Sequence, residues 1–283
     1  VNIRSPFEIG FIFRRFYNSR SNEAGPLGYG WTHTYNIRLN AEYLAEEPQT
    51  GMLKLTDSDG KGRYFLNNRY NDQHNKDLAV ISLDTYRELY FGTSEIKFID
   101  NRYIWKKSNG ITFIFDIDGR LLSIKDKNDN KLILLYNNGS GLLETVTDVA
   151  GNRSLTFKYN ESNRISQIEG PTTDAITDTI WVSFGYDTND NLTSVSYADG
   201  SGFNYAYDDK HNLTRKNDKL DRFISEWRYD IQDRVYENVS RDGTGGTIAY
   251  SNDDVIVTDT YGVRTIYGIE YFQGKSRLTR KTG

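Results

Sequence analysis

The chain has 283 residues, enough for one large or two small domains and for burial of roughly three quarters of its unfolded surface. Its 21 Tyr, 14 Phe and 24 Gly, with many Thr, Val, Ile, Asn and Asp, are typical of an all-β protein with many turns. The net charge of −4, with scattered Lys and Arg, argues against a nucleic-acid partner, and the lack of cysteine excludes disulfides and thiolate metal sites.

The sequence says little about cellular context. No apolar run approaches the roughly 20 residues that a membrane helix needs, so we expect no membrane segment. No signal peptide opens the chain. The first residue is Val1 and the one methionine is Met52, so we expect the chain to be a piece of a longer polypeptide.

Residues 1–39 form a head without internal periodicity. Residues 7–20 alternate imperfectly between apolar and polar side chains, which predicts a strand, or two strands joined by a bulge. Four Gly and Pro residues then lie within residues 25–30 and predict a tight turn. The next residues alternate, which predicts that Trp31, His33 and Tyr35 share one face of a strand. We expect the head to anchor the start of the chain's repeats through Gly28, Gly30, Trp31, His33 and Tyr35.

Shorter elements are predicted between the head and the repeats. Residues 40–50 are polar and predict a loop or a short helical turn. Residues 51–67 contain the run DSDGKG between two apolar runs and predict a hairpin. Residues 67–77 are rich in Asn and Asp and are the best candidate for a mobile loop, and residues 78–103 predict further short strands.

From residue 105 the chain repeats a unit of about 21 residues. In each unit an aromatic residue ends a strand-like run, a polar turn follows, and an aliphatic residue opens the next run six positions later. The aromatic residues are Phe115, Tyr136, Tyr159, Tyr186, Tyr207 and Tyr229, and their aliphatic partners are Leu121, Leu142, Ile165, Leu192, Leu213 and Val235. The aromatic spacings are 21, 23, 27, 21 and 22 residues, and an insertion at 171–179 explains the longest.

A fixed period of this kind predicts tandem antiparallel hairpins that lie side by side in one curved, coiling sheet. We expect residues 1–104 to form a non-repeating β segment and residues 105–283 to continue the same sheet as hairpin repeats. The pattern loosens after Tyr229: Tyr250 and Tyr271 keep the spacing, but only Ile256 keeps the aliphatic position. A second aliphatic often follows the first after three positions, as in Leu121 and Ile124, so either the first folds inward at the turn exit or a bulge intervenes.

Three features resemble sites but have simpler explanations. His33 has no nucleophile or carboxylate partner in the sequence, so a structural hydrogen bond is the better interpretation. The runs that begin at Asp126 and Asp187 lack the glycine and glutamate of a calcium loop, and turn chemistry explains their Asp and Asn. Residues 25–30 lack the Lys and Ser or Thr of a phosphate loop. The sequence therefore predicts no catalytic, metal or cofactor site.

The repeated aromatics allow two interpretations. A stripe of this kind is most simply packing between hairpins, although aromatic stripes on repeat hairpins also bind sugars. Cell-wall-binding repeats of similar length usually carry a Gly-Trp in every unit. Here tryptophan lacks the period and occurs at Trp31, Trp105, Trp181 and Trp227. We favour packing and keep sugar binding as the alternative.

Two parts of the chain resemble bacterial RHS proteins. RRFYNSRS (14–21) and GPLGYGWTHTYNIRL (25–39) resemble the segment that opens an RHS repeat region. FIFDIDGRLLSIKD (113–126) and YDTNDNLTSVSYADG (186–200) resemble RHS or YD repeats. The family's turn glycine, four residues after the aromatic, is kept only as Gly119. The other units hold Ser140, Asn163, Asp190, His211 and Asp233 there, and Lys216 replaces a second aliphatic. Asn, Asp and His tolerate left-handed backbone best, so we expect most turns to keep their shape.

The resemblance implies a function. In that family the repeats wind into a spiralling sheet that closes a hollow shell around a toxic C-terminal domain, or, in animal relatives, present an adhesion surface. No catalytic residue carries over, because the family's self-cleaving aspartates and toxin domain follow the last repeat. We therefore expect an exported, non-enzymatic shell fragment that acts in competition between bacteria. The toxin domain of the same polypeptide is the expected partner, with secretion-apparatus proteins or surface glycans as further ones. The alternative is a cell-surface adhesion or carbohydrate-binding module.

Overall fold

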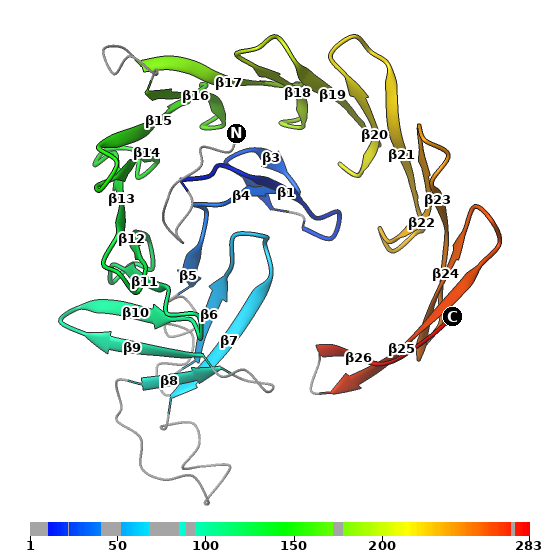
Figure 1. The fold of residues 1–283 in the computed structure, drawn as a ribbon, viewed down its shortest axis with the longest axis horizontal. Coiled ribbons are helices and arrows are strands. Elements are labelled where there is room, and N and C mark those ends of the chain that lie inside the picture. The colour runs from blue at the N-terminus through cyan, green and yellow to red at the C-terminus, as the bar shows by residue number, and fades with distance from the viewer. Residues whose placement is uncertain are drawn as a thin grey trace, which may run out of the picture. The chain divides into compact units, whose positions relative to one another are not determined.

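The computed structural model describes residues 11–21, 23–40, 52–67, 85–88, 94–171, 178–272 and 275–283. Every regular element in these residues is a β-strand, which confirms the predicted all-β class (Figure 1). The predicted loop at 67–77 lies outside the described residues except for Asn67, as do most of the loop at 40–50 and of the insertion at 171–179. The described part of the chain contains no helix that is long and apolar enough to span a membrane.

The strands follow the predicted order of head, intervening segment and repeats. The first are β1 (Arg15–Tyr17), β2 (Ala24–Gly25), β3 (Gly28–Tyr29), β4 (Trp31–His33) and β5 (Arg38–Asn40). Next come β6 (Met52–Thr56), β7 (Gly62–Asn67), β8 (Thr85–Glu88), β9 (Glu95–Ile99) and β10 (Arg102–Lys106). The repeats begin with β11 (Thr112–Phe115), β12 (Leu121–Lys125), β13 (Lys131–Tyr136), β14 (Leu143–Asp148), β15 (Arg153–Tyr159), β16 (Ile165–Pro171), β17 (Asp178–Tyr186) and β18 (Leu192–Tyr197). They continue with β19 (Gly202–Tyr207), β20 (Leu213–Asp218), β21 (Phe223–Tyr229), β22 (Val235–Ser240), β23 (Gly245–Tyr250), β24 (Asp254–Asp259), β25 (Arg264–Phe272) and β26 (Lys275–Thr282).

Strands β5 to β26 belong to one antiparallel sheet in which successive strands of the chain are neighbours, as the repeat pattern predicts. In the head, β1 pairs with β4 and β2 pairs with β3. The chain forms two compact units. The first contains Val1–Tyr17 and Trp31–Trp181, and the second contains Asn18–Gly30 and Val182–Gly283. The head therefore contributes to both units, and the division after residue 104 remains a prediction from the repeat pattern.

Six repeat hairpins contain a β-bulge at their aromatic residue. Phe115 pairs with Leu121, and the register shifts directly before Phe115, so Leu122 is an extra residue in its strand. The same shift precedes Tyr136, Tyr159, Tyr186, Tyr207 and Tyr229, each of which is the last residue of its strand. Because of the extra residue, Leu121 and Ile124 are both buried. Of the two explanations left open by the sequence, the bulge is the right one.

The aliphatic partner predicted for Tyr136 is wrong by one position. Tyr136 pairs with Leu143 rather than with Leu142, and Leu143 is the buried residue of the two. The turn between the strands contains one residue more than the turns of the other five bulged hairpins, and Gly141 has the left-handed backbone, with a φ of 68°. The predicted Ser140 therefore does not take the left-handed position. An added residue in a turn shifts the next strand while the aromatic position is kept.

The turn after Tyr250 is shorter by one residue. Tyr250 pairs with Val255, so the prediction that Ile256 is its partner is wrong. The amide of Ser251 donates to the carbonyl oxygen of Asp254 at 2.8 Å and closes the turn. The hairpin therefore accepts turns of three lengths without losing the aromatic residue at the end of its first strand.

The residue four positions after the aromatic has a left-handed backbone in most turns. The φ angles are 78° at Gly119, 59° at Asn163, 61° at Asp190, 67° at His211 and 57° at Asp233. Asn, Asp and His are the non-glycine residues that reach this region most easily. The expectation that these turns keep their shape without glycine is confirmed.

In the first unit the head supplies much of the core. Phe11, Ile37 and Leu39 are buried. The ring of Phe157 in β15 lies 6.0 Å from the rings of Phe13 and His33 and meets Tyr35 edge-on at 6.5 Å. The sheet contributes the apolar face of its repeats. These buried side chains include Phe113, Phe115, Leu121, Ile124, Leu132, Leu134, Leu143, Val146, Leu155, Ile165 and Ile168.

In the second unit burial is uneven along the sheet. Leu27 of the head is fully buried, and six array side chains in β17–β20 are buried as well: Val182, Phe184, Leu192, Val195, Tyr205 and Leu213. Within the described residues of β21–β26, by contrast, no apolar side chain is buried. Hairpins with the same backbone structure therefore occur both with buried apolar side chains and without them.

Candidate functional site

Five tyrosine hydroxyls each join a hairpin to the one before it. Tyr136 donates a hydrogen bond to the carbonyl oxygen of Leu121 at 2.9 Å. Within the same unit Tyr159 donates to Leu143, and in the second unit Tyr207 donates to Leu192, Tyr229 to Leu213 and Tyr250 to Val235, at 2.7–2.8 Å. In every case the acceptor is the aliphatic residue that pairs with the preceding aromatic. The period of the sequence is therefore the number of residues between one such hydrogen bond and the next along the chain.

We call these hydroxyls and their carbonyl partners the tyrosine ladder. The ladder hydroxyls act as structural hydrogen-bond donors. Burial raises the pKa of Tyr136 to about 12 and also raises the pKa of Tyr159. Desolvation disfavours the charged phenolate, so these hydroxyls stay protonated at neutral pH and keep their hydrogen bonds. Their donor hydrogens are already used by main-chain carbonyl groups. This arrangement favours the packing interpretation of the tyrosine stripe over sugar binding.

Aspartates close the turns of the array. In the turn after β12, one carboxylate oxygen of Asp126 accepts from the amides of Asn128 and Asn130 at 2.8 and 3.0 Å, and the other accepts from the Asn130 side chain at 2.8 Å. Although desolvation acts in the opposite direction, these hydrogen bonds hold the pKa of Asp126 below its ordinary value. Equivalent bonds join Asp116 to Arg120, Asp187 to Asn191, Asp208 to Asn212, Asp218 to Arg222 and Asp230 to Arg234. The runs that resemble calcium loops thus use their carboxylates within the turn.

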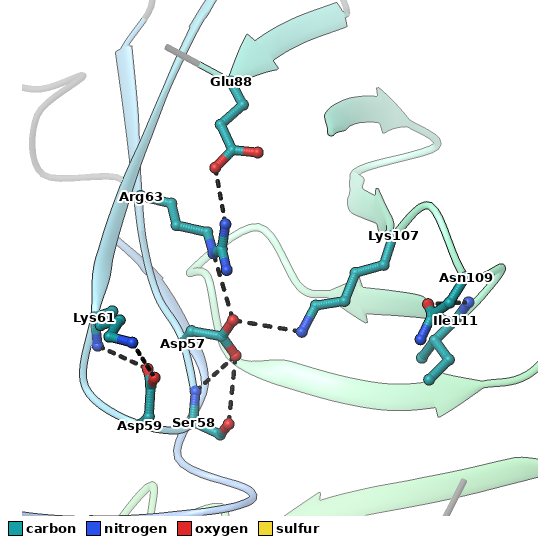
Figure 2. Close-up of polar contacts among 9 residues, drawn as sticks. All are labelled: Asp57, Ser58, Asp59, Lys61, Arg63, Glu88, Lys107, Asn109 and Ile111. Carbon is teal, nitrogen blue, oxygen red and sulfur yellow. Dashed lines mark hydrogen bonds and ion pairs between the residues drawn. The ribbon is translucent and has the colours of Figure 1, made fainter. Parts of the chain in front are cut away.

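A cluster of charged side chains joins separate hairpins of the first unit (Figure 2). A carboxylate oxygen of Asp57, directly after β6, lies 3.4 Å from both Arg63 Nε in β7 and Lys107 Nζ after β10. Arg63 also donates to Glu88 in β8 at 2.9 Å. The side chains of Asp57 and Glu88 are each 9% exposed, whereas those of Arg63 and Lys107 are 37% and 30% exposed, so the carboxylates are buried and the cations reach the surface. Figure 2 shows the four charged groups in a single chain from Glu88 to Lys107.

The cluster closes a sharp coil of the sheet. The turns that contain Asp57 and Lys107 lie at the same end of the strands. They are four strand spacings apart, which is about 19 Å in a flat sheet. The ion pair between them therefore requires that strands β6–β10 coil strongly. Lys107 Nζ also lies 4.4 Å from the ring of the fully buried Trp105. The Lys107 ammonium group therefore makes both an ion pair with Asp57 and a cation–π contact with Trp105.

The charged cluster is suited to structure rather than to proton transfer. Two carboxylates face two cations, so the formal charges cancel. Desolvation opposes the charge of Arg63, but its hydrogen bond to Glu88 and the nearby charge of Asp57 raise the pKa of Arg63. A catalytic acid and base pair needs carboxylates whose environments differ, and here both carboxylates are paired with cations. In the described part of the chain, no three His, Asp or Glu side chains are placed to hold a metal ion.

His33 lies in the core of the first unit. It is 2% exposed, and its Nδ1 accepts a hydrogen bond from the amide of Tyr35 at 3.3 Å. Its ring lies 5.2 Å from Phe13 and 6.0 Å from Phe157. Burial lowers the pKa of His33 to about 3, because the imidazolium would lose its hydration. The imidazole is therefore neutral and enclosed by apolar rings, a structural environment.

The predicted head residues do not form one site. Trp31, His33 and Tyr35 are buried in the first unit, and Trp31 lies 5.2 Å from the ring of Tyr17. Gly28 and Gly30 belong to the second unit and have φ angles of 87° and 70°. At Gly28 a Cβ atom would lie 2.3 Å from the carbonyl oxygen of Asp190. Only glycine allows this approach.

Sequence reasoning missed two features of the site. The Asp57–Lys107 ion pair joins residues 50 positions apart, and Asp57 lies outside the repeats, so no spacing indicates the pair. The second is a stacked contact between Tyr29 and His211, whose ring centroids lie 3.8 Å apart. A signal for this contact was present, since His211 is the one histidine at the left-handed turn position. The sequence did not identify its partner.

The fold and these contacts define a class: an all-β protein of tandem tyrosine-aspartate hairpins with a glycine-rich head. Comparison with known families agrees. The model described as RHS Repeat matches residues 186–222, and the model of a domain of unknown function, DUF6531, matches residues 2–65. Residues 186–222 are therefore similar to an RHS repeat, and the chain as a whole resembles RHS-repeat proteins.

Individual relatives are much longer than this chain. A curated protein named probable deoxyribonuclease RhsB, from Dickeya dadantii (strain 3937), is 23% identical over 278 residues, which are 95% of this chain and 18% of the relative. The solved structures titled TcdB2-TccC3-Cdc42 and TcdB2-TccC3-TEV are each 12% identical and cover 89% of this chain and 15% of theirs, with TM-scores of 0.37 and 0.36. The fold assignment rests on the strand order and registers described above.

Proposed function

We propose that the chain forms part of the wall of an RHS-type shell. The shell would enclose and protect a toxin cargo that the same polypeptide carries outside these residues, and the polypeptide would act after export. The observation that carries this proposal is the continuous pairing of β5–β26, reinforced by the tyrosine ladder between hairpins. A wall of paired strands leaves few backbone groups for a protease or another chain to engage. The chain itself acts by confinement and needs no catalytic group.

The charge distribution supports a passive wall. His33 is buried and neutral, the turn aspartates are occupied by turn amides, and Asp57 is paired with two cations. A nucleophile with an adjacent base is the minimum for covalent catalysis. Nothing in the residues that the structure describes joins these groups into such a pair. The relative named probable deoxyribonuclease is much longer, and this chain covers 18% of it.

Protease protection of the whole polypeptide tests the proposal. We would express the natural full-length polypeptide and follow its limited proteolysis by mass spectrometry. Tyr159→Ala and Tyr207→Ala remove two ladder contacts, and Glu161→Ala, in an exposed turn, is the matched control. We expect segments outside the wall to be protected in the wild type and in the control, and to be cleaved earlier in the ladder variants.

Two results would contradict enclosure. One is equal cleavage of the remaining segments in wild-type and ladder variants, which would show that the wall protects nothing. The other is saturable binding of the isolated chain to an immobilised glycan together with unprotected downstream segments. That second result would favour the adhesion or carbohydrate-binding alternative.

A further inference from the structure

Four of the left-handed residues that follow an aromatic by four positions also contact the head: Gly119, Asp190, His211 and Asp233. In the first unit, the amide of Leu39 donates to the carbonyl oxygen of Gly119 at 2.9 Å. A Cβ atom on Gly119 would lie 1.9 Å from the carbonyl oxygen of Leu39. Gly119 is thus required by the crossing of the head as well as by its φ of 78°. This explains why the turn glycine is kept at this hairpin.

In the second unit, one head segment meets three consecutive turns. We call residues Asn18–Gly30 the strap, of which all but Asn22 are described. Gly28 lies against the carbonyl oxygen of Asp190, Tyr29 stacks on His211 at 3.8 Å, and Ser19 Oγ donates to the carbonyl oxygen of Asp233 at 3.1 Å. The three turn residues are equivalent positions of successive hairpins. The strap therefore follows the row of left-handed residues.

Two of these three contacts cannot distinguish one hairpin from the next. The strap touches Asp190 and Asp233 through their main-chain carbonyl oxygens, and every turn of the array offers the same group. Successive turns are also only about 10 Å apart, two strand spacings. A strap held by carbonyl groups alone could therefore bind one hairpin too early or too late.

The stack on His211 is the contact that depends on side-chain identity. Its ring is parallel to that of Tyr29 within 16°. His211 Nδ1 lies 2.7 Å from Asn191 Oδ1 of the preceding turn, which fixes the orientation of the imidazole ring. The other described turns have Gly, Asn or Asp at this position, and none of these offers an aromatic face.

We propose that the left-handed turn residues specify the register in which the head docks on the array, with His211 as the determinant for the strap. The backbone geometry of the turn admits Gly, Asn, Asp or His, so the position can vary without loss of the hairpin. Because the residue at this position can vary, its side chain can distinguish one hairpin from its neighbours. A residue other than the family's turn glycine at this position can therefore determine where the head docks.

Hydrogen exchange of the strap tests the contribution of the stack. His211→Asn keeps a residue that tolerates the turn and removes the ring. An aromatic pair contributes about 0.5–1.5 kcal/mol, so we expect the Asn18 amide, which donates to the carbonyl oxygen of Gly30 at 2.8 Å, to exchange about 2- to 10-fold faster. Tyr29→Ala should give the same change, and Tyr29→Phe, which keeps the ring, should give none. Asp221→Asn is the control, because Asp221 has a φ of 62° on the opposite edge.

Cross-linking tests register directly, because the natural chain has no cysteine. Ser19→Cys is combined either with Ile231→Cys, in the turn that the strap meets, or with Asp209→Cys, at the equivalent position one hairpin earlier. With His211 present, a short bis-maleimide should join position 19 to 231 in preference to 209. His211→Asn should raise the yield with 209 several-fold. The proposal fails if the preference is unchanged in that variant, or if the effects of His211→Asn and Tyr29→Ala on exchange are additive.

Discussion

Two hairpins of the second unit share a backbone plan but differ in burial. In β17–β18, Phe184 pairs with Val195 two residues before the aromatic, and both side chains are buried. In β21–β22, Trp227 pairs with Asn238 at the equivalent positions, and both are only half-buried. The first hairpin lies next to the head strap through Leu192, whose amide nitrogen would be 3.4 Å from a Cβ atom on Gly28.

The difference separates what shapes a hairpin from what stabilises it. Both hairpins have the bulge before the tyrosine, and both have an aspartate that caps the turn. These local features are sufficient for the shape. Apolar burial is concentrated where a hairpin is covered, and burial is the main source of folding free energy. Covered hairpins should therefore dominate stability, and uncovered ones should accept polar residues such as Asn238.

The largest expected effect compares two tryptophans. Trp31→Ala should lower the free energy of unfolding by about 3–5 kcal/mol, because the side chain is 8% exposed and packs in the core of the first unit. Trp227→Ala, in the uncovered region, should cost less than about half of that. Urea denaturation followed by circular dichroism measures both. Equal losses would show that cover by the head does not control stability, and a Trp31→Ala protein of normal stability that no longer binds a glycan would make the head a recognition site.

The second prediction compares two glycines with nearly equal backbones. Gly28 and Gly200 have φ angles of 87° and 81°, so alanine at either costs about 1–2 kcal/mol in backbone strain. Nothing lies within 4 Å of a Cβ atom on Gly200, whereas one on Gly28 would overlap the carbonyl oxygen of Asp190. Gly28→Ala should therefore destabilise by a further ~1–3 kcal/mol. If the two melting temperatures fell equally, the close approach of the strap would be absent in solution.

The third prediction concerns acid and the core of the first unit. The pKa of His33 is lowered from an ordinary value of 6.5 to about 3, so only the unfolded chain binds this proton between those values. Stability from this group is therefore fully present above pH 6.5 and decreases as the pH falls toward 3, by about 2 kcal/mol at pH 5. Denaturation from pH 7 to pH 4 measures the slope. His33→Gln should be flatter over this range, and an unchanged slope would assign the proton to another group.

The smallest effect compares two rungs of the tyrosine ladder. Tyr159→Phe should cost about 0.5–1.5 kcal/mol, because it leaves the carbonyl oxygen of Leu143 without its donor in a covered region. Tyr250→Phe removes the equivalent bond to Val235 in the uncovered region, where water can replace the hydroxyl, and should cost less. Thermal unfolding at neutral pH compares them. A larger loss for Tyr250→Phe would mean that the last hairpins are covered in solution.

The sequence by itself was sufficient to predict the hairpins. The interval from each aromatic to the next aliphatic predicted the strands, the turns and their neighbours, because hairpin geometry depends on contacts within about 20 residues. The left-handed turns were equally local, since Asn163, Asp190, His211 and Asp233 can adopt that backbone by themselves. Where spacing misled, at Leu142 and Ile256, the turn length had changed by one residue and the register followed it.

Only the tertiary structure decided which residues far apart in the chain meet. Asp57 and Lys107 are brought together by the coil of β6–β10, and Tyr29 and His211 by the path of the strap, and neither contact has a period. The burial of His33 among aromatic rings was likewise invisible in a sequence that showed only alternation. The physical reason is that periodicity reports which face of a strand a side chain occupies, whereas cover on that face comes from whichever distant segment packs there.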